Sequence, residues 1–548
     1  FFFNDTAITE SDTRARHDAR PIYTNRHVFL TGKAGTGKTT FLRYVREHCF
    51  KKLAVVAPTG VAAVNAGGVT IHSFFQLPFG MYLPTHPSAW GDTDTSIYNE
   101  NQLLGKMKLP ASKRDMIREL DLLIIDEISM VRADLLDAMD ATLRAVRRKP
   151  LEPFGGLQVL YIGDLFQLPP VIKEKERQLF GEVYASPFFF DAKVMLTAPP
   201  VYLELKKIYR QKDQQFIDLL NSIRCNTATQ AELEVLNGRY DPEFNPPPEQ
   251  GYITLTTHNH KADEINNRHL GELAGKSHRF SSEVTGEFPE NAYPASAVLE
   301  LKEGAQVMLI KNDKGDDRRY YNGKIGIIQR IDSHGKNVFV TFPGETSMVE
   351  LPMETWQNIR FRYDPETDEI EEEELGTFKQ FPLRLAWAVT IHKSQGLTFE
   401  KAIVDAGASF AAGQVYVALS RLTSLGGLVL KSRISPFNIR TDGRIIAFAA
   451  NEAPEEMLQQ TLDAAEQDFL ASEIVKVFEW HRAVEKIAQV TRGGKVLTMA
   501  DKRQELEWLN QLRACAIIQH QTAEKFRTQL ARMLAPGKQA DHTLLLDR

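Results

Sequence analysis

The sequence has few cysteines and no long apolar run. Only three of its 548 residues are cysteine, Cys49, Cys225 and Cys515, and none of them belongs to a CxxC pair. This spacing argues against a cysteine-built zinc site or disulfide scaffold and favours a reducing, cytoplasmic location. No apolar stretch approaches the ~18 residues that a membrane-spanning helix needs. Residues 1–5 lack the basic and apolar regions of a secretory signal, so neither secretion nor membrane insertion is expected.

The sequence also lacks a strong excess of either charge. It has 66 Lys and Arg against 71 Asp and Glu, a net charge of −5, which does not by itself indicate nucleic-acid binding. Any such binding must come from a local basic groove, because net charge governs solubility and steering rather than sites. Hydrophobic residues make up 43% and charged residues 25%, which is typical of a globular protein and excludes a fibrous, collagen-like or wholly disordered chain.

Short apolar runs alternate with helical patterns in two parts of the chain, and this alternation predicts parallel α/β sheets. In the first part, strands are expected at 27–31, 53–57, 122–125 and 159–162, and a helix at 39–49. The second part starts near Tyr202, with strands expected at 252–257, 402–405 and 427–430 and helices at 262–270 and 414–421.

Three segments depart from this alternation. Residues 72–109 are rich in Pro, Gly and aromatic side chains, which predicts an insertion outside the first sheet. Within 302–384, short strands are expected at 306–310, 325–330, 338–342 and 348–351, so this segment is a small all-β insertion, with the acidic run 371–374 on a solvated hairpin. After 451, two long amphipathic helices joined at Gly493-Gly494 are expected, because neither Pro nor Gly interrupts either pattern.

The strongest functional motif is the phosphate-binding loop Gly32-Lys33-Ala34-Gly35-Thr36-Gly37-Lys38-Thr39. Its glycines let backbone N–H groups cradle phosphates, and the following helix contributes its N-terminal dipole. Lys38 is expected to reach the β- and γ-phosphates, and the Thr39 hydroxyl to bind Mg²⁺. The residues expected to bind ATP are Gly35, Thr36, Gly37, Lys38, Thr39 and Thr40. A chance Gly-rich match is disfavoured, because the motif lies between an expected strand and an expected helix.

Two carboxylates and a glutamine follow other expected strands. Asp126 comes directly after the strand at 122–125, where it can hold Mg²⁺, and Glu127 can polarise the attacking water. An Asp-Glu pair is common on surfaces, but beside a phosphate-binding loop it indicates a hydrolytic pair. Gln167, in the segment 163–170, is suited to sensing the γ-phosphate or orienting water. Alone, that segment would indicate only a turn.

The ordered motifs resemble those of superfamily 1B helicases. Besides the phosphate-binding loop, they are Ala57–Ala63, Thr70–Phe75, Asp126–Met130, Gly163–Pro170, Ala388–Gly396 and Tyr416–Arg421. Within that group the chain resembles the Pif-one (petite integration frequency) DNA helicases, most specifically in Ser129-Met130-Val131 followed by Pro153–Gln158. The resemblance covers about residues 25–440 and leaves out the last hundred or so.

This resemblance implies two RecA-like domains in tandem that clamp ATP and Mg²⁺ between them. It assigns the first domain to 1–73 and 113–200, with a wedge insertion at 74–112. The second domain takes 201–301 and 385–450, with a Src-homology-three-like barrel at 302–384, and a helical extension follows at 451–548. Arg210 and Arg421 are implied as arginine fingers that stabilise transition-state charge, and Gln395 as a bridge between the ATP and DNA sites. Without the resemblance, an isolated Arg would indicate only a solvated face.

The resemblance also implies DNA contacts and substrates. The contacts fall on Pro58, Thr59, His72, His258, Asn259, Thr390, His392 and Lys393, a set of short polar groups, imidazoles and helix N-termini that suits phosphates and bases. For a single His, a satisfied core or surface position is the alternative. The implied substrates are single-stranded DNA, its junctions with duplex, stalled forks and G-quadruplexes, with roles in DNA repair, recombination and telomere maintenance. In a bacterium the enzyme would be nucleoid-associated. No Gln precedes Lys38, whereas many helicases read adenine with an upstream Gln. The alternatives are that adenine is not read specifically, or that backbone groups near Asn25 and His27 read it.

The sequence therefore predicts an ATP-driven 5′→3′ DNA helicase. The alternatives are a P-loop ATPase that remodels protein or serves a nuclease, and a small-molecule phosphotransferase, which a second RecA-like half argues against. A non-enzymatic scaffold is the least favoured reading. For the C-terminal helices, packing against the helicase core of a monomer is expected, with pairing of two copies and docking of a protein partner as alternatives.

Overall fold

A computed structural model describes residues 20–84, 97–211, 213–313, 319–332, 337–405, 413–493 and 502–534. These residues form two compact units, one of residues 27–452 and one that joins the N-terminal segment up to Arg26 with the chain from Ala453 onward. Part of the expected insertion, 85–96, and the expected joint at Gly494 lie outside the described residues. No helix in the described ranges combines the length and the apolar character that crossing a membrane requires.

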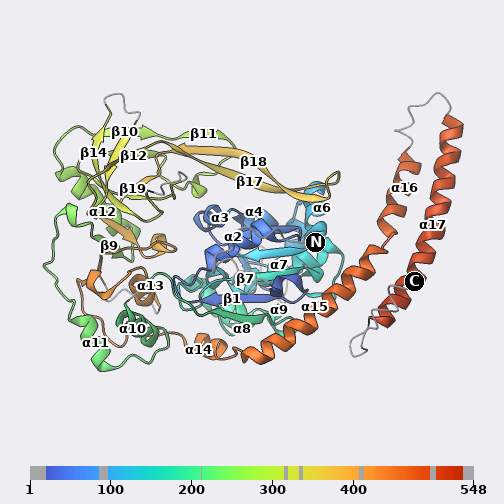
Figure 1. The fold of residues 1–548 in the computed structure, drawn as a ribbon, viewed down its shortest axis with the longest axis horizontal. Coiled ribbons are helices and arrows are strands. Elements are labelled where there is room, and N and C mark those ends of the chain that lie inside the picture. The colour runs from blue at the N-terminus through green and yellow to red at the C-terminus, as the bar shows by residue number, and fades with distance from the viewer. Residues whose placement is uncertain are drawn as a thin grey trace. The chain divides into compact units, whose positions relative to one another are not determined.

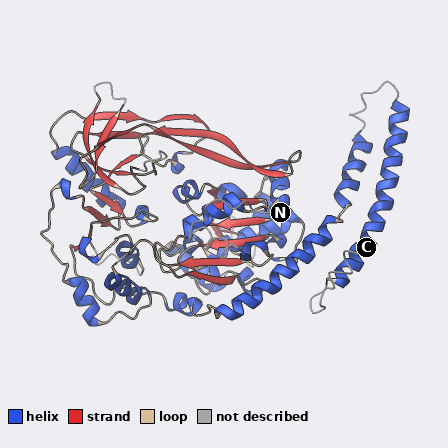
Figure 2. Ribbon diagram, viewed as in Figure 1, coloured by secondary structure: helices blue, strands red, loops and turns tan. Residues whose placement is uncertain are grey.

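The larger unit contains a six-stranded sheet in the order β3-β2-β6-β7-β1-β8, with every neighbouring pair parallel (Figures 1 and 2). Its strands are β1 (Val28–Gly32), β2 (Leu53–Ala57), β3 (Val69–Thr70), β6 (Leu122–Ile125), β7 (Gln158–Ile162) and β8 (Val201–Leu205). The helices α2 (Lys38–His48), α3 (Gly60–Ala66), α6 (Ala111–Glu119) and α7 (Ala133–Arg147) connect them. This parallel pairing confirms the predicted α/β fold. As expected for a parallel sheet with both faces covered, β1, β6 and β7 are buried along their whole length.

A second parallel sheet has four strands in the order β20-β9-β21-β22. The strands are β9 (Ile253–Thr256), β20 (Ala388–Thr390), β21 (Ala402–Val404) and β22 (Leu428–Leu430). The accompanying helices are α10 (Gln214–Arg224), α11 (Gln230–Asn237), α12 (Asn259–Glu272) and α13 (Gln414–Ser420). This sheet matches the second alternating part of the sequence.

The expected boundary at residue 201 is wrong. The strand that starts there, β8, pairs with β1 of the first sheet from Val28↔Val201 to Gly32↔Leu205. The chain therefore passes to the second sheet only after β8. The sequence does not reveal this, because a short edge strand has the same pattern whichever sheet it joins.

The insertion in the first part is separate from the six-stranded sheet. After α4 (Ile71–Phe75), the short strands β4 (Met81–Tyr82) and β5 (Ile97–Tyr98) pair only with each other in the described residues, and α5 (Glu100–Lys106) follows. Tyr82 and Tyr98 are buried, so this segment packs through aromatic side chains.

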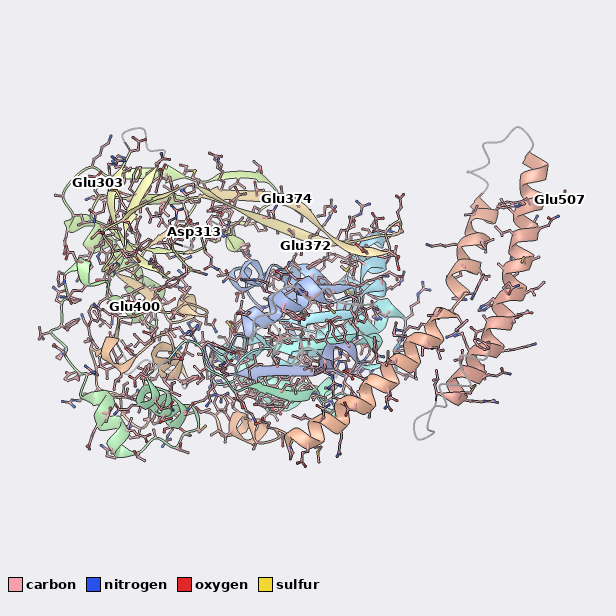
Figure 3. All side chains as sticks on the ribbon, in the orientation of Figure 1. Glu303, Asp313, Glu372, Glu374, Glu400 and Glu507 are labelled. Atoms are coloured by element: carbon pink, nitrogen blue, oxygen red, sulfur yellow. The ribbon has the colours of Figure 1, made fainter. Side chains whose placement is uncertain are left out.

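The β-rich insertion is an antiparallel sheet in the order β16-β15-β14-β13-β19, together with a long hairpin. The sheet strands are β13 (Gln306–Leu309), β14 (Ile325–Ile331), β15 (Val338–Thr341), β16 (Met348–Leu351) and β19 (Leu383–Leu385). The hairpin consists of β17 (Glu354–Asp364) and β18 (Glu369–Gln380), and the acidic run lies on it as predicted (Figure 3). The expected start at 302 is too late. Strands β10 (His278–Ser281), β11 (Glu283–Gly286) and β12 (Val298–Leu301) belong here, because β11 pairs with β18 and Phe280 joins the same core as Val307.

The hairpin reaches back to the first sheet's helices and packs against α6 and α3 (Figure 1). Glu372 pairs with Arg46 at 2.8 Å, and Asp368 pairs with Lys52 at 2.7 Å. The ring of Phe361 lies edge-on to Phe74, with centroids 6.2 Å apart. The hairpin thus links the β-rich insertion to the phosphate-binding half of the unit.

The smaller unit is helical and contains η1 (Arg20–Tyr23), α15 (Glu455–Val477), α16 (His481–Gly493) and α17 (Lys502–Met533). The prediction of one unbroken helix up to Gly493 is wrong, because the chain leaves the helix at Phe478–Trp480. No Gly or Pro marks this break. The Phe478 ring packs edge-on against Phe526 of α17 at 4.9 Å, a tertiary contact that outweighs local helix propensity.

Candidate functional site

The phosphate-binding loop lies between β1 and α2, as its mechanism requires. Gly35 and Gly37 have φ of +82° and +95°, backbone conformations that favour glycine. A Cβ on Gly37 would meet no atom within 4 Å, so the loop is open to solvent at this residue. Thr36 is buried, and its hydroxyl donates to the Lys33 carbonyl at 2.9 Å. The loop geometry therefore fits a nucleotide.

Lys38, Thr39 and Thr40 open α2. The Lys38 Nζ donates to the carbonyls of Gly32 at 2.6 Å and Lys33 at 3.1 Å, which holds the ammonium over the loop. Burial lowers the pKa of Lys38, while Asp164 and Glu127 oppose that change. Thr39 and Thr40 are exposed on the first helical turn. The hydroxyl of Thr39 is therefore available as an oxygen ligand for a hard cation.

The predicted carboxylates follow β6 at its carboxyl end. The Glu127 backbone N–H donates to Asp126 Oδ1 at 2.9 Å, and Glu127 itself has a φ of +51°, which is uncommon for a residue with a side chain. Burial and the neighbouring Glu127 raise the pKa of Asp126 to about 7. Burial also raises the pKa of Glu127, against the opposing charges of Lys38 and Arg421. Two partly buried carboxylates form a donor set that suits a divalent cation.

Gln167 is held by the buried carboxylate of Asp164 at the end of β7. Gln167 Nε2 donates to Asp164 Oδ2 at 3.2 Å, and the Phe166 backbone N–H donates to Asp164 Oδ1 at 3.2 Å. Since a carboxylate only accepts, the Gln167 amide must present its N–H to Asp164 and its carbonyl oxygen elsewhere. The side chain is thus oriented rather than freely rotating.

Both predicted arginines converge on this region. The Gly35 carbonyl accepts from the Tyr209 N–H at 2.9 Å, and a Cβ on Gly35 would lie 2.3 Å from the Arg210 Cβ, so Arg210 lies against the loop. Arg210 Nη1 donates to the Ser420 carbonyl at 3.1 Å. Arg421 follows α13, is 1% exposed, and donates from Nε to the Val417 carbonyl. Burial lowers the pKa of both arginines, but a guanidinium remains charged in proteins.

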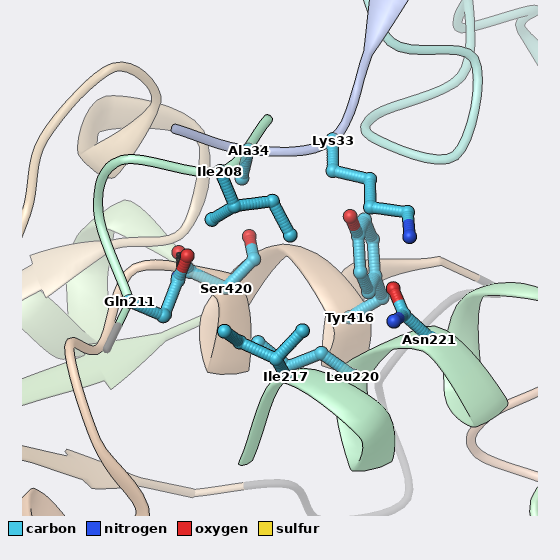
Figure 4. A pocket seen from close by; sticks show the side chains of 9 residues that line it. All are labelled: Lys33, Ala34, Ile208, Gln211, Ile217, Leu220, Asn221, Tyr416 and Ser420. Carbon is cyan, nitrogen blue, oxygen red and sulfur yellow. Dashed lines mark hydrogen bonds between the residues drawn. The ribbon is translucent and has the colours of Figure 1, made fainter. Parts of the chain in front are cut away.

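A small pocket lies beside the loop, between β1 and the helices of the second sheet (Figure 4). Its lining residues are Lys33, Ala34, Ile208, Gln211, Ile217, Leu220, Asn221, Tyr416 and Ser420. Gln211 closes one side and donates from Nε2 to the carbonyls of Ser420 at 3.2 Å and Leu422 at 3.1 Å. These contacts join the segment between β8 and α10 to the end of α13.

The residues predicted to contact DNA lie where parallel strands of both sheets end. Pro58 and Thr59 follow β2, and the Thr59 hydroxyl accepts from the Ala62 N–H at the start of α3. His72 lies in α4, just after β3. After β9, His258 occupies the N-cap position of α12 and Asn259 is its first residue. The Nδ1 atom of His258 lies 2.7 Å from the Thr257 hydroxyl oxygen.

The remaining predicted contacts follow β20. Thr390 is buried, and its hydroxyl accepts from the Lys393 N–H at 3.3 Å, so Thr390 orders this turn. His392 and Lys393 have much of their side-chain surface exposed there, and partial burial of the His392 ring and the Lys393 ammonium lowers the pKa of both. Gln395 follows, and its Nε2 is buried with no hydrogen-bond partner among the described residues. A buried amide without a partner is consistent with a group that acts only when a ligand is bound.

Sequence reasoning missed three residues at these sites. Arg224 is buried between Asp164 and Glu204, and nothing in the pattern of α10 distinguishes it from a solvated arginine. Tyr416 is buried and lines the pocket beside the loop, whereas the motif Tyr416–Arg421 predicts a role only for Arg421. Phe79 is 79% exposed and stacks on His72, with ring centroids 5.0 Å apart. Its position beside Pro78 and Gly80 offers a weak signal of an exposed turn.

The chain is similar to known DNA helicases. A family model described as PIF1-like helicase matches residues 18–233. The human ATP-dependent DNA helicase PIF1 is 34% identical over 465 residues, which cover 83% of this chain and 65% of the human protein. The Pif1 of Psychrobacter sp. is 30% identical over 519 residues, which cover 82% of this chain and 73% of that protein. The chain thus spans less than two thirds of the human relative's length.

Solved structures match over a similar span. The crystal structure of Bacteroides sp Pif1 in complex with ADP-AlF4 has 39% sequence identity and a TM-score of 0.72, covering 81% of this chain and 97% of that one. The structure of Bacteroides Pif1 bound to ssDNA matches with a TM-score of 0.55 over the same shares of the two chains.

Proposed function

Because the chain belongs to the Pif1 family of helicases, we propose that it is an ATP-dependent DNA helicase that moves 5′→3′ along single-stranded DNA. One observation carries the proposal: Arg210 lies against the phosphate-binding loop of the first sheet and donates to the carbonyl of Ser420, so this loop meets the end of α13 of the second sheet that leads into Arg421. A hydrolytic carboxylate and an arginine on separate sheets are what a motor needs, since closing the two halves then completes the catalytic set.

In this proposal ATP binds at the loop of β1 and α2. Gly35, Thr36, Gly37, Lys38, Thr39 and Thr40 would hold the phosphates, and Thr39 and Asp126 would supply oxygen ligands to Mg²⁺. The bound Mg²⁺ would neutralise phosphate charge. Glu127 would take a proton from the attacking water, Gln167 would orient that water, and Arg210 and Arg421 would stabilise the transferred charge. The complex of Bacteroides sp Pif1 with ADP-AlF4 supports nucleotide binding by this fold.

Single-stranded DNA would cross the carboxyl ends of both sheets. The contacts would come from Pro58, Thr59, His72, His258, Asn259, Thr390, His392 and Lys393, with Gln395 linking them to the nucleotide. Phe79 would extend this path as an exposed ring on which a base can stack. The ssDNA complex of Bacteroides Pif1 supports such a path.

We assign the parts of the chain as follows. The first RecA-like domain takes 27–73 and 113–205, the wedge takes 74–112, the second RecA-like domain takes 206–277 and 385–452, and a Src-homology-three-like barrel takes 278–384. The five-stranded antiparallel sheet β16-β15-β14-β13-β19 supports the last assignment. Forks are proposed substrates, supported by the structure of two Pif1 helicases at forked dsDNA. The proposal also includes G-quadruplex unwinding and roles in repair, recombination and telomere maintenance. It further includes action as a monomer, partner binding through the C-terminal helices and a nucleoid location.

A strand-displacement assay with two duplexes that differ only in whether the single-stranded tail is 5′ or 3′ tests both the direction of movement and the dependence on ATP hydrolysis. A duplex with a 5′ single-stranded tail should be unwound in the presence of ATP and Mg²⁺, and one with a 3′ tail should not. Lys38→Ala should abolish both unwinding and DNA-stimulated ATPase activity, because the ammonium serves the phosphates. Lys175→Ala, at an exposed lysine of η4 (Glu174–Glu176), is the matched control and should behave as the wild type. ATPase activity that single-stranded DNA does not stimulate would favour the protein-remodelling alternative.

A further inference from the structure

Arg224 is a buried cation outside the catalytic set assigned above. It ends α10, is 5% exposed, and its Nη1 donates to Glu204 of β8 at 3.0 Å. Its Nη2 lies 3.6 Å from Asp164 Oδ1, and its guanidinium carbon is 4.1 Å from the centre of the Phe166 ring. Burial opposes the charge, but Asp164, Tyr416 and Glu204 raise the pKa of Arg224 above its ordinary value. Arg224 therefore joins α10 to the ends of two strands of the first sheet.

The arginine reaches Gln167 through one carboxylate. Asp164 Oδ1 faces Arg224, and Asp164 Oδ2 accepts from Gln167 Nε2 at 3.2 Å. Asp164 is fully buried, so water cannot replace Arg224 as its counter-charge. Asp164 Oδ1 therefore lies between the Phe166 N–H, which donates to it at 3.2 Å, and the charge of Arg224, while Asp164 Oδ2 sets the direction in which the Gln167 carbonyl oxygen points.

The contact between Arg224 and Asp164 is incomplete in this structure. A separation of 3.6 Å is within range of an ion pair but too long for a good hydrogen bond, and Arg224 Nε and Nη2 are buried without hydrogen-bond partners among the described residues. Buried donors of this kind are costly and call for an explanation. A small shift of α10 toward β7 would shorten the contact and satisfy Nη2.

α10 also packs against α13, the helix that leads into Arg421. In the segment just before α10, Arg210 and Gln211 both donate to the Ser420 carbonyl. α10 therefore contacts the arginine side of the site at one end and, through Arg224, the Asp164–Gln167 pair at the other. The two sides of the site are thus connected through α10 by direct contacts.

We propose that Arg224 is a positioning residue for ATP hydrolysis, which orients Gln167 through Asp164 according to the position of α10. The inference rests on the proposed function, because it assumes that Gln167 orients the attacking water. It assigns Arg224 no contact with the nucleotide. Loss of Arg224 should then lower kcat and leave the KM for ATP unchanged, since phosphate binding by Lys38 and the loop is retained.

A double-mutant cycle on the full chain tests this inference. Arg224→Lys keeps the buried charge, but a lysine lacks the fork that reaches Glu204 and Asp164 together, so kcat of the DNA-stimulated ATPase should fall about 5- to 50-fold. Gln167→Ala should lower kcat by itself. In the Gln167→Ala background, Arg224→Lys should cost less than about twofold more, because both changes remove the same interaction.

Two matched variants separate positioning from stability. Arg144→Lys alters another arginine on a helix, paired with Asp140 at 2.7 Å, and should leave kcat unchanged. Glu204→Gln keeps a hydrogen-bond acceptor for Arg224 and should change kcat less than twofold. Independent, multiplicative losses from Arg224→Lys and Gln167→Ala, or a lower melting temperature with unchanged kcat, would overturn the inference while the proposed function stands. A wild-type chain without ATPase activity would overturn both.

Discussion

The exposed ring of Phe79 permits a prediction about DNA affinity that is separate from catalysis. Phe79 is 79% exposed and stacks on the ring of His72, a proposed DNA contact, with an angle of 18° between the two planes. Burial lowers the pKa of His72, so at neutral pH its ring is uncharged and stacks as an aromatic group. The pair therefore presents a flat, largely apolar face on which a base can lie.

The expected effect of Phe79→Ala follows from that face. Stacking of a base on an aromatic side chain is worth about 1–3 kcal/mol in alanine substitutions, which corresponds to an affinity about 5- to 150-fold weaker. Because so little of the ring is buried, the melting temperature should stay within about 2 °C of wild type. No charge is removed, so the dependence of affinity on salt should keep its slope.

Fluorescence anisotropy with a labelled oligothymidine, without nucleotide, measures the effect. Phe50→Ala is the matched control, because Phe50 is 70% exposed but lies between α2 and β2, at the opposite end of β2 from Pro58 and Thr59. The control should bind as the wild type does. An affinity of Phe79→Ala within twofold of wild type, or an equal loss in both variants, would refute the proposed stacking.

Three further predictions concern catalysis, charge and the smaller unit. Glu127→Gln should retain bound ATP in a filter-binding assay while turnover falls about 10²- to 10⁴-fold, because the general base is lost and Lys38 remains; near-normal turnover would contradict the assignment. The affinity for single-stranded DNA should fall with salt despite the net charge of −5, with a log–log slope of about −0.7 per phosphate neutralised, and a flat dependence would exclude backbone tracking. A chain that ends after Glu452 should keep DNA-stimulated ATPase activity. A chain that ends after Arg440 should also keep this activity but have a lower melting temperature, because it loses α14 (Gly443–Ala449), whose Phe448 ring stacks on the Phe190 ring with centroids 4.5 Å apart. Loss of ATPase activity in a folded chain ending at Glu452 would show that the helical unit is part of the motor.

The elements that the sequence predicts best are buried strands with clear ends. The predicted strand 53–57 coincides with β2, and 122–125 coincides with β6, because both are apolar runs followed by polar or small residues. The phosphate-binding loop is equally predictable, since its chemistry lies within eight consecutive residues. In these places local sequence and tertiary environment favour the same structure.

Other features depend on partners that are distant in the chain. The length of β18 is set by its register with β17, where the acidic residues Glu371 to Glu374 face Arg362 to Ile359 across the hairpin. The break at Phe478 depends on Phe526 of another helix. β8 is an edge strand whose pairing with β1 leaves no mark in its own sequence. Periodicity cannot reveal such choices, because it reports which side of an element is buried and not what buries it.

The residues proposed for catalysis also divide into those that the local sequence predicts and those that only the fold reveals. Lys38, Asp126 and Glu127 are identified by residues adjacent to them, whereas the Ser420 carbonyl that accepts from Arg210 lies 210 positions further along the chain. Arg224 belongs to no motif, and its proposed role appears only when Glu204, Asp164 and Phe166 are seen around it. A residue that binds phosphate must satisfy a fixed local geometry, but a residue that couples two sheets needs only a charge at the right place in the fold. Groups that bind the nucleotide are therefore the predictable part of such a site, and groups that link binding to movement must be found in the structure.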